Sequence, residues 1–531
     1  MVRDRAEMSC VFFSILLCNK GLQMFNNTSF FLRLFSLAAL SSMALMGCNS
    51  DSSSSTTTDV TTSDTSSDDD ITTSDTTVSE YETDNSIGLI LNSSNAQNGY
   101  TLFGGLRFNQ TYLIDNCGEV VQSWDSDYST MSAYLLENGN LLHTARFQSA
   151  VNSEFIQAGG DSGRIEIIDE QNELVWYYEV NSDTQFMHHD AEYIESTGTV
   201  LVMVWNKHSA EEAAAAGYTG GHALWSEQII ELDPTADNAD DAIVWQWDSW
   251  DHMVQDVDYS LDNYGVISEN PQLININFEG IDIEYEADPI HMNSVDYNEE
   301  LDQIVINSRN FSEFWIIDHS TTTEEAASHS GGARGKGGDI LFRWGNPQAY
   351  DMGDDDDQKL FLQHDAYWID EGYTHAGQIM VFNNQPNFYG NADYSTIDVI
   401  DTEVSDAGDY TINDDGTYGP SDFTWTYTAD TPTDFYATNI SGAQRLSNGN
   451  TIIDEGTTGT FFEVTAEGEV VWKYIAPVDQ TGVLTQGDTP QNNFVFRINK
   501  YSPDFIGLSY YSLESSGTIE NGSDYTCELF E

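Results

Sequence analysis

Three histidines occupy the same position in a sequence repeat, each directly ahead of a short apolar strand. They are His189, His291 and His364, and Arg309 stands eighteen residues after the second of them. Neutral imidazole can act as a nucleophile or as a general acid and base near neutral pH, and the planar guanidinium fork suits a phosphate or a sulfate. The pattern predicts a small cationic pocket with catalytic imidazoles.

Two other interpretations of this cluster have to be weighed. Histidines at strand ends can simply satisfy backbone groups, and three imidazoles with Asp190 and Asp365 nearby could hold zinc. Arg309 argues against zinc because a cation beside a divalent ion is unfavourable, so we assign no metal and no cofactor. The other eight histidines share no repeat position. Among them, His188 is expected to point away from His189 if the segment is extended.

The elements that position these residues form a repeat. Each unit contains about four short strands with alternating apolar residues and Gly, Asn or Asp turns, which is typical of a twisted antiparallel sheet. Five complete units run from 131 to 474, and a sixth is divided between outer strands near 100–124 and an inner strand near 493–502. We predict an all-β fold, a six-bladed β-propeller whose closing blade is shared between the N- and C-terminal strands. Insertions leave five or seven blades as alternatives.

A propeller exposes the start of each innermost strand around its central channel. The three histidines hold this position in their units, whereas the other two complete units carry Met131-Ser132 and Ser441-Gly442 there. A position that should look alike in every repeat, but holds imidazole in three of them, indicates a shared site on the axis.

The two cysteines of the folded region bear on how the ring closes. Cys117 lies in the N-terminal part of the shared blade, and Cys527 lies near the end of the chain. In an exported protein, this pair is expected to form a disulfide that locks the closure. Two buried free thiols are the alternative.

The N-terminus predicts export and a lipid anchor. Residues 1–47 form a lipoprotein-type signal peptide, with a possible true start at Met24, because a short apolar stretch ends in Leu-Met-Gly before Cys48. Residues 48–86 comprise this anchor cysteine and a Ser/Thr/Asp tract too polar to bury surface, and they are expected to be a flexible tether. The folded part is predicted at 87–531, outside the cytoplasm, at the periplasmic or outer surface of a bacterial membrane. A plain secretory signal is the alternative.

The charge of the chain excludes one class of partner. There are 88 Asp and Glu against 17 Lys and Arg, which gives a formal net charge of −71. Nucleic-acid affinity depends on Lys and Arg that neutralise phosphates. We therefore expect no nucleic-acid partner, and contact with a membrane only through the lipid anchor.

The segments that carry the histidines resemble the bacterial arylsulfate sulfotransferases, which do not use PAPS. The resemblance rests on an HxNS…SR pair, at His291 to Arg309, and on further matching segments. Those segments are 187–198, 361–369 and 441–474. The resemblance covers most of the chain from residue 100 onward, and it too implies a six-bladed propeller.

The resemblance also implies a reaction and roles for individual residues. A sulfuryl group would pass from an aryl sulfate donor to a phenolic acceptor by a ping-pong route through a sulfohistidine. His364 matches the transient nucleophile, and His189, His291, Asn293 and Arg309 match the pocket partners. No nucleotide donor is expected, since a GxxxxGK[ST] loop is not found in the sequence. The competing hypotheses are a non-catalytic, surface-anchored propeller that binds a ligand or a protein, and a metal-dependent hydrolase that uses the same imidazoles.

Overall fold

The computed structural model describes residues 80–147, 154–281, 283, 285–405, 407–523, 527 and 530. Cys48, the predicted signal peptide and most of the predicted tether lie outside this range. Within the described part of the chain, no helix combines the length and the apolar character needed to cross a membrane.

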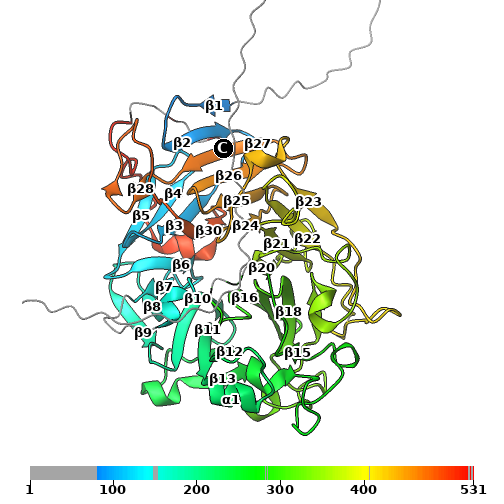
Figure 1. The fold of residues 1–531 in the computed structure, drawn as a ribbon. Helices are drawn as coiled ribbons and strands as arrows, with labels where there is room; N and C mark the ends of the chain where they lie inside the picture. The colour runs from blue at the N-terminus through cyan, green and yellow to red at the C-terminus, as the bar shows by residue number, and fades with distance from the viewer. Residues whose placement is uncertain are drawn as a thin grey trace, which may run out of the picture. The chain divides into compact units, whose positions relative to one another are not determined.

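Six antiparallel sheets are arranged as the blades of a β-propeller around a common axis (Figure 1). The predicted all-β, six-bladed fold is therefore confirmed. We number the blades in ring order, with the innermost strand of each given first. Blade 1 is β30 (Val495–Tyr501), β3 (Tyr100–Gly105), β4 (Gln110–Asp115) and β5 (Val120–Asp125); blade 2 is β6 (Ser129–Leu135), β7 (Leu141–Arg146), β8 (Gly163–Ile168) and β9 (Leu174–Glu179); blade 3 is β10 (Gln185–Ile194), β11 (Thr199–His208), β12 (Leu224–Leu232) and β13 (Ile243–Asp248).

The second half of the ring follows the same plan. Blade 4 is β16 (Met292–Asn298), β17 (Gln303–Ser308), β18 (Glu313–Asp318) and β19 (Phe342–Trp344); blade 5 is β20 (His364–Trp368), β21 (Ile379–Asn383), β22 (Thr396–Ile400) and β23 (Trp425–Tyr427); blade 6 is β24 (Gly442–Arg445), β25 (Thr451–Glu455), β26 (Thr460–Val464) and β27 (Val470–Ile475).

Short elements fill the connections between these strands. They are the strand pairs β14 (Met253–Val254) with β15 (Ile274–Asn275) and β28 (Val478–Asp479) with β29 (Gly482–Val483), the helices α1 (Ala210–Ala215) and α2 (Thr323–Ala326), and the 3-10 turns η1 (Glu154–Gln157), η2 (Ala239–Asp241), η3 (Ser249–His252), η4 (Ile267–Glu269), η5 (Pro347–Tyr350), η6 (Pro432–Asp434) and η7 (Ile506–Tyr510).

The ring closes in two places. In blade 1, the C-terminal β30 pairs with the N-terminal β3, as the sequence predicted. In blade 6, two N-terminal strands that were not predicted, β1 (Glu80–Glu82) and β2 (Gly88–Ser93), extend the sheet beyond β27. The strand β1 lies inside the range assigned to the tether, because its Tyr81 packs against the apolar core that blades 1 and 6 share.

Cys117 and Cys527 form the expected disulfide, which joins residues 410 positions apart in the chain. Its two halves come from the loop after β4 and from the C-terminal segment. The crosslink therefore secures the ends of the ring against each other.

The middle strands of the blades are buried more completely than the alternating sequence pattern suggested. Every residue of β12, β17 and β18 is buried, whereas the outermost β9 alternates between exposed and half-buried positions. Neighbouring blades cover both faces of a middle strand, and only the outer edge meets water. This packing fixes the inner strands, which carry the candidate site.

Candidate active site

The backbone bends where the histidines meet the axis. His189 has φ 50° and His291 has φ 52°, both in the left-handed region that non-glycine residues rarely adopt. The pairing of β10 with β11 shifts register between His188 and Ala191, which marks a β-bulge. Such strain persists where the surroundings enforce it and is common at active sites. Both bends lie at the innermost strand of a blade, in β10 and directly before β16.

A glycine of blade 2, Gly160, makes room for the His189 imidazole. A Cβ on Gly160 would lie 2.0 Å from atoms of the His189 imidazole, and the Gly160 carbonyl accepts a 2.7 Å bond from the His189 N–H. Replacement of this glycine would therefore push the ring out of the axis.

The structure brings the predicted cationic residues together in a buried cluster. The rings of His189 and His291 meet edge to face with centroids 4.8 Å apart. After burial, the charges of His291, His364 and Arg309 lower the pKa of His189, and those of Arg309 and His291 lower the pKa of His364, so the four groups lie close together. All four residues are at most 6% exposed.

His188 departs from the prediction, because the bulge breaks the regular alternation of side chains. Its Nδ1 lies 2.9 Å from Nδ1 of His189, so the two rings are in contact. The Nε2 atom lies 2.9 Å from the buried carboxylate of Glu227, and the ring stacks on Trp205 with centroids 4.1 Å apart. His188 thus contacts the cluster through His189 and is itself held by Glu227 and Trp205.

His364 is held in one tautomer by its neighbours. Its Nδ1 lies 2.8 Å from the Asn384 side-chain oxygen, and the Asn384 amide group donates to the carbonyls of Ala437 and Ile440, which fixes the amide orientation. An amide oxygen only accepts, so Nδ1 carries the proton. Nε2 then keeps its lone pair, which accepts a 3.2 Å bond from the Ile440 N–H.

The charge state of the cluster follows from burial. Burial, and next the Arg309 charge, hold the pKa of His364 well below its usual 6.5. Burial and the neighbouring His291, followed by His188 and His364, do the same for the pKa of His189. Both rings are therefore neutral at physiological pH, and their nitrogen lone pairs are available.

An acidic partner orients His291. Its Nδ1 donates to Asp288 Oδ2 at 2.6 Å, and both groups are buried. Asn310 connects this pair to the guanidinium, since its amide donates to the Asp288 carbonyl and its oxygen accepts from Arg309 Nη1 at 2.8 Å. A carboxylate behind an imidazole fixes the tautomer and stabilises the protonated ring. His291 is therefore suited to proton transfer.

Asn293, the predicted substrate-binding residue, lies fully buried beneath the cluster. Its amide donates to the Gln363 carbonyl at 3.0 Å, and its oxygen accepts from the Asn307 amide at 2.7 Å. The first of these bonds ties blade 4 to the residue just before His364, and the second lies within blade 4. A contact between Asn293 and a substrate stays a prediction.

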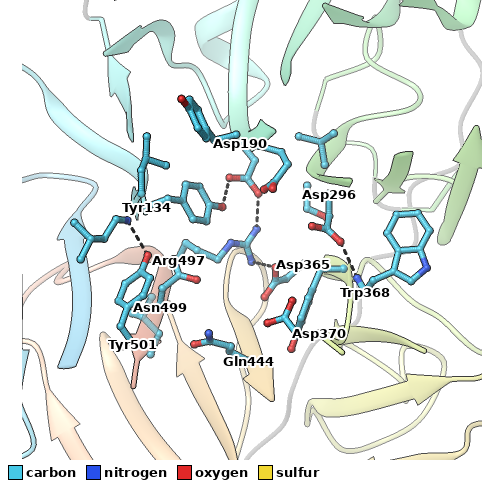
Figure 2. A pocket seen from close by; sticks show the side chains of 18 of the residues that line it. Tyr134, Asp190, Asp296, Asp365, Trp368, Asp370, Gln444, Arg497, Asn499 and Tyr501 are labelled. Carbon is cyan, nitrogen blue, oxygen red and sulfur yellow. Dashed lines mark hydrogen bonds and ion pairs between the residues drawn. The ribbon is translucent and has the colours of Figure 1, made fainter. Parts of the chain in front are cut away.

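An ion-paired arginine that sequence reasoning missed ties three blades together across the axis (Figure 2). Arg497, on β30, contacts Asp190 of β10 at 3.2 Å and Asp365 of β20 at 2.7 Å. Tyr134, on β6, donates to the other oxygen of Asp190 at 2.5 Å. All three charged groups are buried, so the pairs have little screening by water.

This arginine also supports the cluster. Asp190 directly follows His189, and Asp365 directly follows His364. The two ion pairs with Arg497 therefore fix the backbone from which both imidazoles project. Asp365 points to Arg497 rather than to its neighbouring ring.

The same arginine lines a cavity of about 440 Å³ whose other ionisable residues are mostly acidic. Asp296 and Asp370 face it together with Asp190 and Asp365 (Figure 2). Burial, more than the neighbouring carboxylates, raises the pKa of Asp296 to about 8. This acidic side disfavours an anionic ligand, whereas the imidazole and guanidinium cluster suits one.

The fold and the site define a class: a propeller with a buried imidazole and guanidinium cluster at its axis. The chain belongs to the arylsulfotransferase family, because the family model "Arylsulfotransferase (ASST)" matches residues 75–500. That range contains every residue of the cluster and Arg497. The family implies a sulfotransferase that acts on aryl sulfates and phenols.

Other comparisons add little. No curated protein matches the sequence. A Bacteroides caccae protein of unknown function is 11% identical, with a TM-score of 0.37 over 71% of this chain and 94% of that one. The WD40 domain of Toxoplasma gondii coronin is 6% identical, with a TM-score of 0.36 over 76% of each chain. Similarities this low support no functional inference.

Proposed function

We propose that the protein is an arylsulfate sulfotransferase that forms a sulfohistidine at His364 in a ping-pong reaction without a nucleotide donor. The observation that supports this most is the state of His364: a neutral ring, fixed by Asn384 at Nδ1, with the Nε2 lone pair inside a cationic cluster. Such a nitrogen is a competent nucleophile toward an electron-poor sulfur.

The first half-reaction uses the cluster as follows. The sulfuryl oxygens of the donor face Arg309, and the Ile440 N–H bond to Nε2 is released. His364 Nε2 forms a bond to sulfur while the bond from sulfur to the aryl oxygen breaks, and the phenolate leaves with that electron pair. Protonated His291, stabilised by Asp288, can donate a proton to a poor leaving group. Arg309 stabilises the charge that develops in the transition state.

The second half-reaction reverses these roles. A phenolic acceptor gives its proton to His291 and attacks sulfur through oxygen. The bond between sulfur and Nε2 breaks, its electron pair returns to the imidazole, and the aryl sulfate product leaves. The enzyme is then ready for another donor.

A chromogenic aryl sulfate tests this proposal. Purified protein should release the chromophore far faster when phenol is present, and phenyl sulfate should accumulate in equal amount. A chelator should leave the rate unchanged at a temperature where the protein stays folded. Release that needs a metal would favour the hydrolase, and the absence of release with a range of donors would favour the binding module.

The first half-reaction should depend weakly on pH on the acid side. Since the pKa of His364 is lowered, the ring stays neutral as the pH falls through 6.5, where an ordinary imidazole would lose about tenfold per unit. We expect the burst of chromophore from a donor with a good leaving group to keep its rate constant across this range. A burst that falls with an apparent pKa near 6.5 would contradict the assignment.

We also propose that the protein is exported and anchored through Cys48. The disulfide between Cys117 and Cys527 supports an oxidising compartment. In a bacterial host, the wild type should fractionate with membranes and incorporate labelled palmitate. Cys48→Ser should lose the label and become soluble outside the cytoplasm, because the anchor thiol is removed. Equal labelling of both forms would contradict this proposal.

A further inference from the structure

A second cluster of histidines lies away from the axis, at the outer edge of blades 3 and 4. His252 ends η3, just after the outermost strand of blade 3, while His329 and Asp339 lie between α2 and β19, the outermost strand of blade 4. One ligand atom from each of these residues lies within 4.8 Å of the others. None of the three belongs to the axial cluster.

The hydrogen bonds of His252 place a proton on Nε2, so its contact between Nδ1 and Asp339 needs a proton or a metal ion. Its Nε2 lies 2.8 Å from the Ala326 carbonyl, which only accepts, so Nε2 carries a proton. In a neutral ring, Nδ1 is then a bare lone pair, and it lies 2.9 Å from the carboxylate oxygen Oδ1 of Asp339. His329 Nδ1 lies 2.7 Å from the same oxygen. Two lone pairs at this distance repel unless a proton or a metal ion lies between them.

The surroundings of His252 resemble those of a metal ligand. The ring is fully buried and stacks parallel to Trp247, with centroids 5.7 Å apart. A Cβ on Gly338 would lie 2.6 Å from Nε2, so the close approach of this backbone holds the ring in place. Metal-binding histidines commonly donate their second N–H to a backbone carbonyl, which fixes the ring and raises its basicity.

His319 provides a contrast within the same chain. Its two ring nitrogens contact carboxylates, Asp302 at 2.8 Å and Glu231 at 3.2 Å. Despite burial, hydrogen bonds to these carboxylates raise the pKa of His319 to about 9, so it is an ordinary imidazolium. At His252, a neutral carbonyl replaces the second carboxylate, and a second imidazole converges on Asp339.

We infer that His252 Nδ1, His329 Nδ1 and the Asp339 carboxylate form a site for a divalent transition metal, with zinc as the best match. Imidazole and carboxylate ligands suit zinc, whereas calcium and magnesium prefer oxygen alone. Zinc–ligand bonds of about 2.0–2.1 Å in a tetrahedron require each histidine nitrogen to move ~0.5 Å away from Asp339 Oδ1. The His329 side chain is 62% exposed, so it can make this adjustment.

The position of the site indicates its role. A cavity of about 520 Å³, lined by His329 and Asp251, adjoins it and allows water to complete the coordination. The metal would join the connection that precedes β19 to η3, and thus fasten the outer edge of blade 4 to blade 3. This role is independent of the proposed sulfuryl transfer.

Zinc binding by the mature protein tests the inference. After chelator treatment and dialysis, equilibrium dialysis with zinc should show one tight site, and zinc should raise the melting temperature. Cobalt should give the visible absorption of a tetrahedral site. His329→Ala is expected to weaken zinc binding at least about tenfold and to abolish the thermal shift. The exposed position of His329 keeps this variant folded.

Two control variants separate this site from the rest of the protein. His375→Ala removes a histidine from blade 5, and His364→Ala removes one from the axial cluster; both should bind zinc like the wild type. No tight zinc binding by the wild type, equal affinity in His329→Ala, or loss of binding in His364→Ala would each overturn the inference. Sulfuryl transfer enters none of these measurements.

Discussion

Replacement of His364 by alanine is expected to abolish sulfuryl transfer and leave the propeller folded. The variant lacks the ring that Asn384 holds at Nδ1, and with it the Nε2 lone pair inside the cationic cluster. Loss of a nucleophile typically costs several orders of magnitude, so we expect kcat to fall at least about 10³-fold. The rate is measured with a chromogenic aryl sulfate and phenol, together with circular dichroism and thermal unfolding.

The matched control for this variant is His375→Ala, which removes a partly exposed imidazole outside the cluster. Its rate should equal that of the wild type. Transfer by His364→Ala within about threefold of the wild-type rate would rule out His364 as the nucleophile. His291→Ala should lose more of the wild-type rate with donors that have poor leaving groups than with donors that have good ones. Only a poor leaving group needs the proton that His291 donates.

The largest effect on stability is expected from Arg497→Met. The substitution leaves the carboxylates of Asp190 and Asp365 buried without a counter-ion, and breaking a buried ion pair costs about 3–5 kcal/mol. The unfolding midpoint in urea should fall accordingly. Transfer should slow as well, because each aspartate fixes the backbone of a histidine in the cluster.

A compensated variant separates charge from packing. Combining Arg497→Met with Asp190→Asn and Asp365→Asn removes the unpaired charges and should recover part of the lost stability. Arg107→Met, at an exposed position, should change stability by less than about 0.5 kcal/mol. A midpoint for Arg497→Met equal to that of Arg107→Met would show that the ion pairs contribute nothing.

The ring and its axial residues were open to prediction because repeats carry positional information. Equivalent residues of repeated units reach equivalent places, so the shared phase of three histidines predicts that they lie on the axis. The disulfide was predictable because Cys117 and Cys527 are the two cysteines of the predicted folded part, 87–531.

The supporting contacts were not predictable, because they join distant residues at irregular backbone. Arg497 and Asp190 are 307 positions apart, and Asn384 lies just beyond the end of β21. His188 was misplaced since a left-handed residue breaks strand alternation. One signal was available: the His-Asp pair recurs at 189–190 and 364–365, and arginine is scarce in this chain.

A search for the covalent intermediate is the most direct test of His364 as the nucleophile. The protein is mixed with an aryl sulfate without acceptor, quenched under alkaline conditions that preserve phosphoramidate-like bonds, digested and analysed by mass spectrometry. One added SO₃ group is expected on His364, and it should disappear when phenol is added before the quench. Turnover with no added group, or with the group on another residue, would contradict the assignment of His364 as the nucleophile.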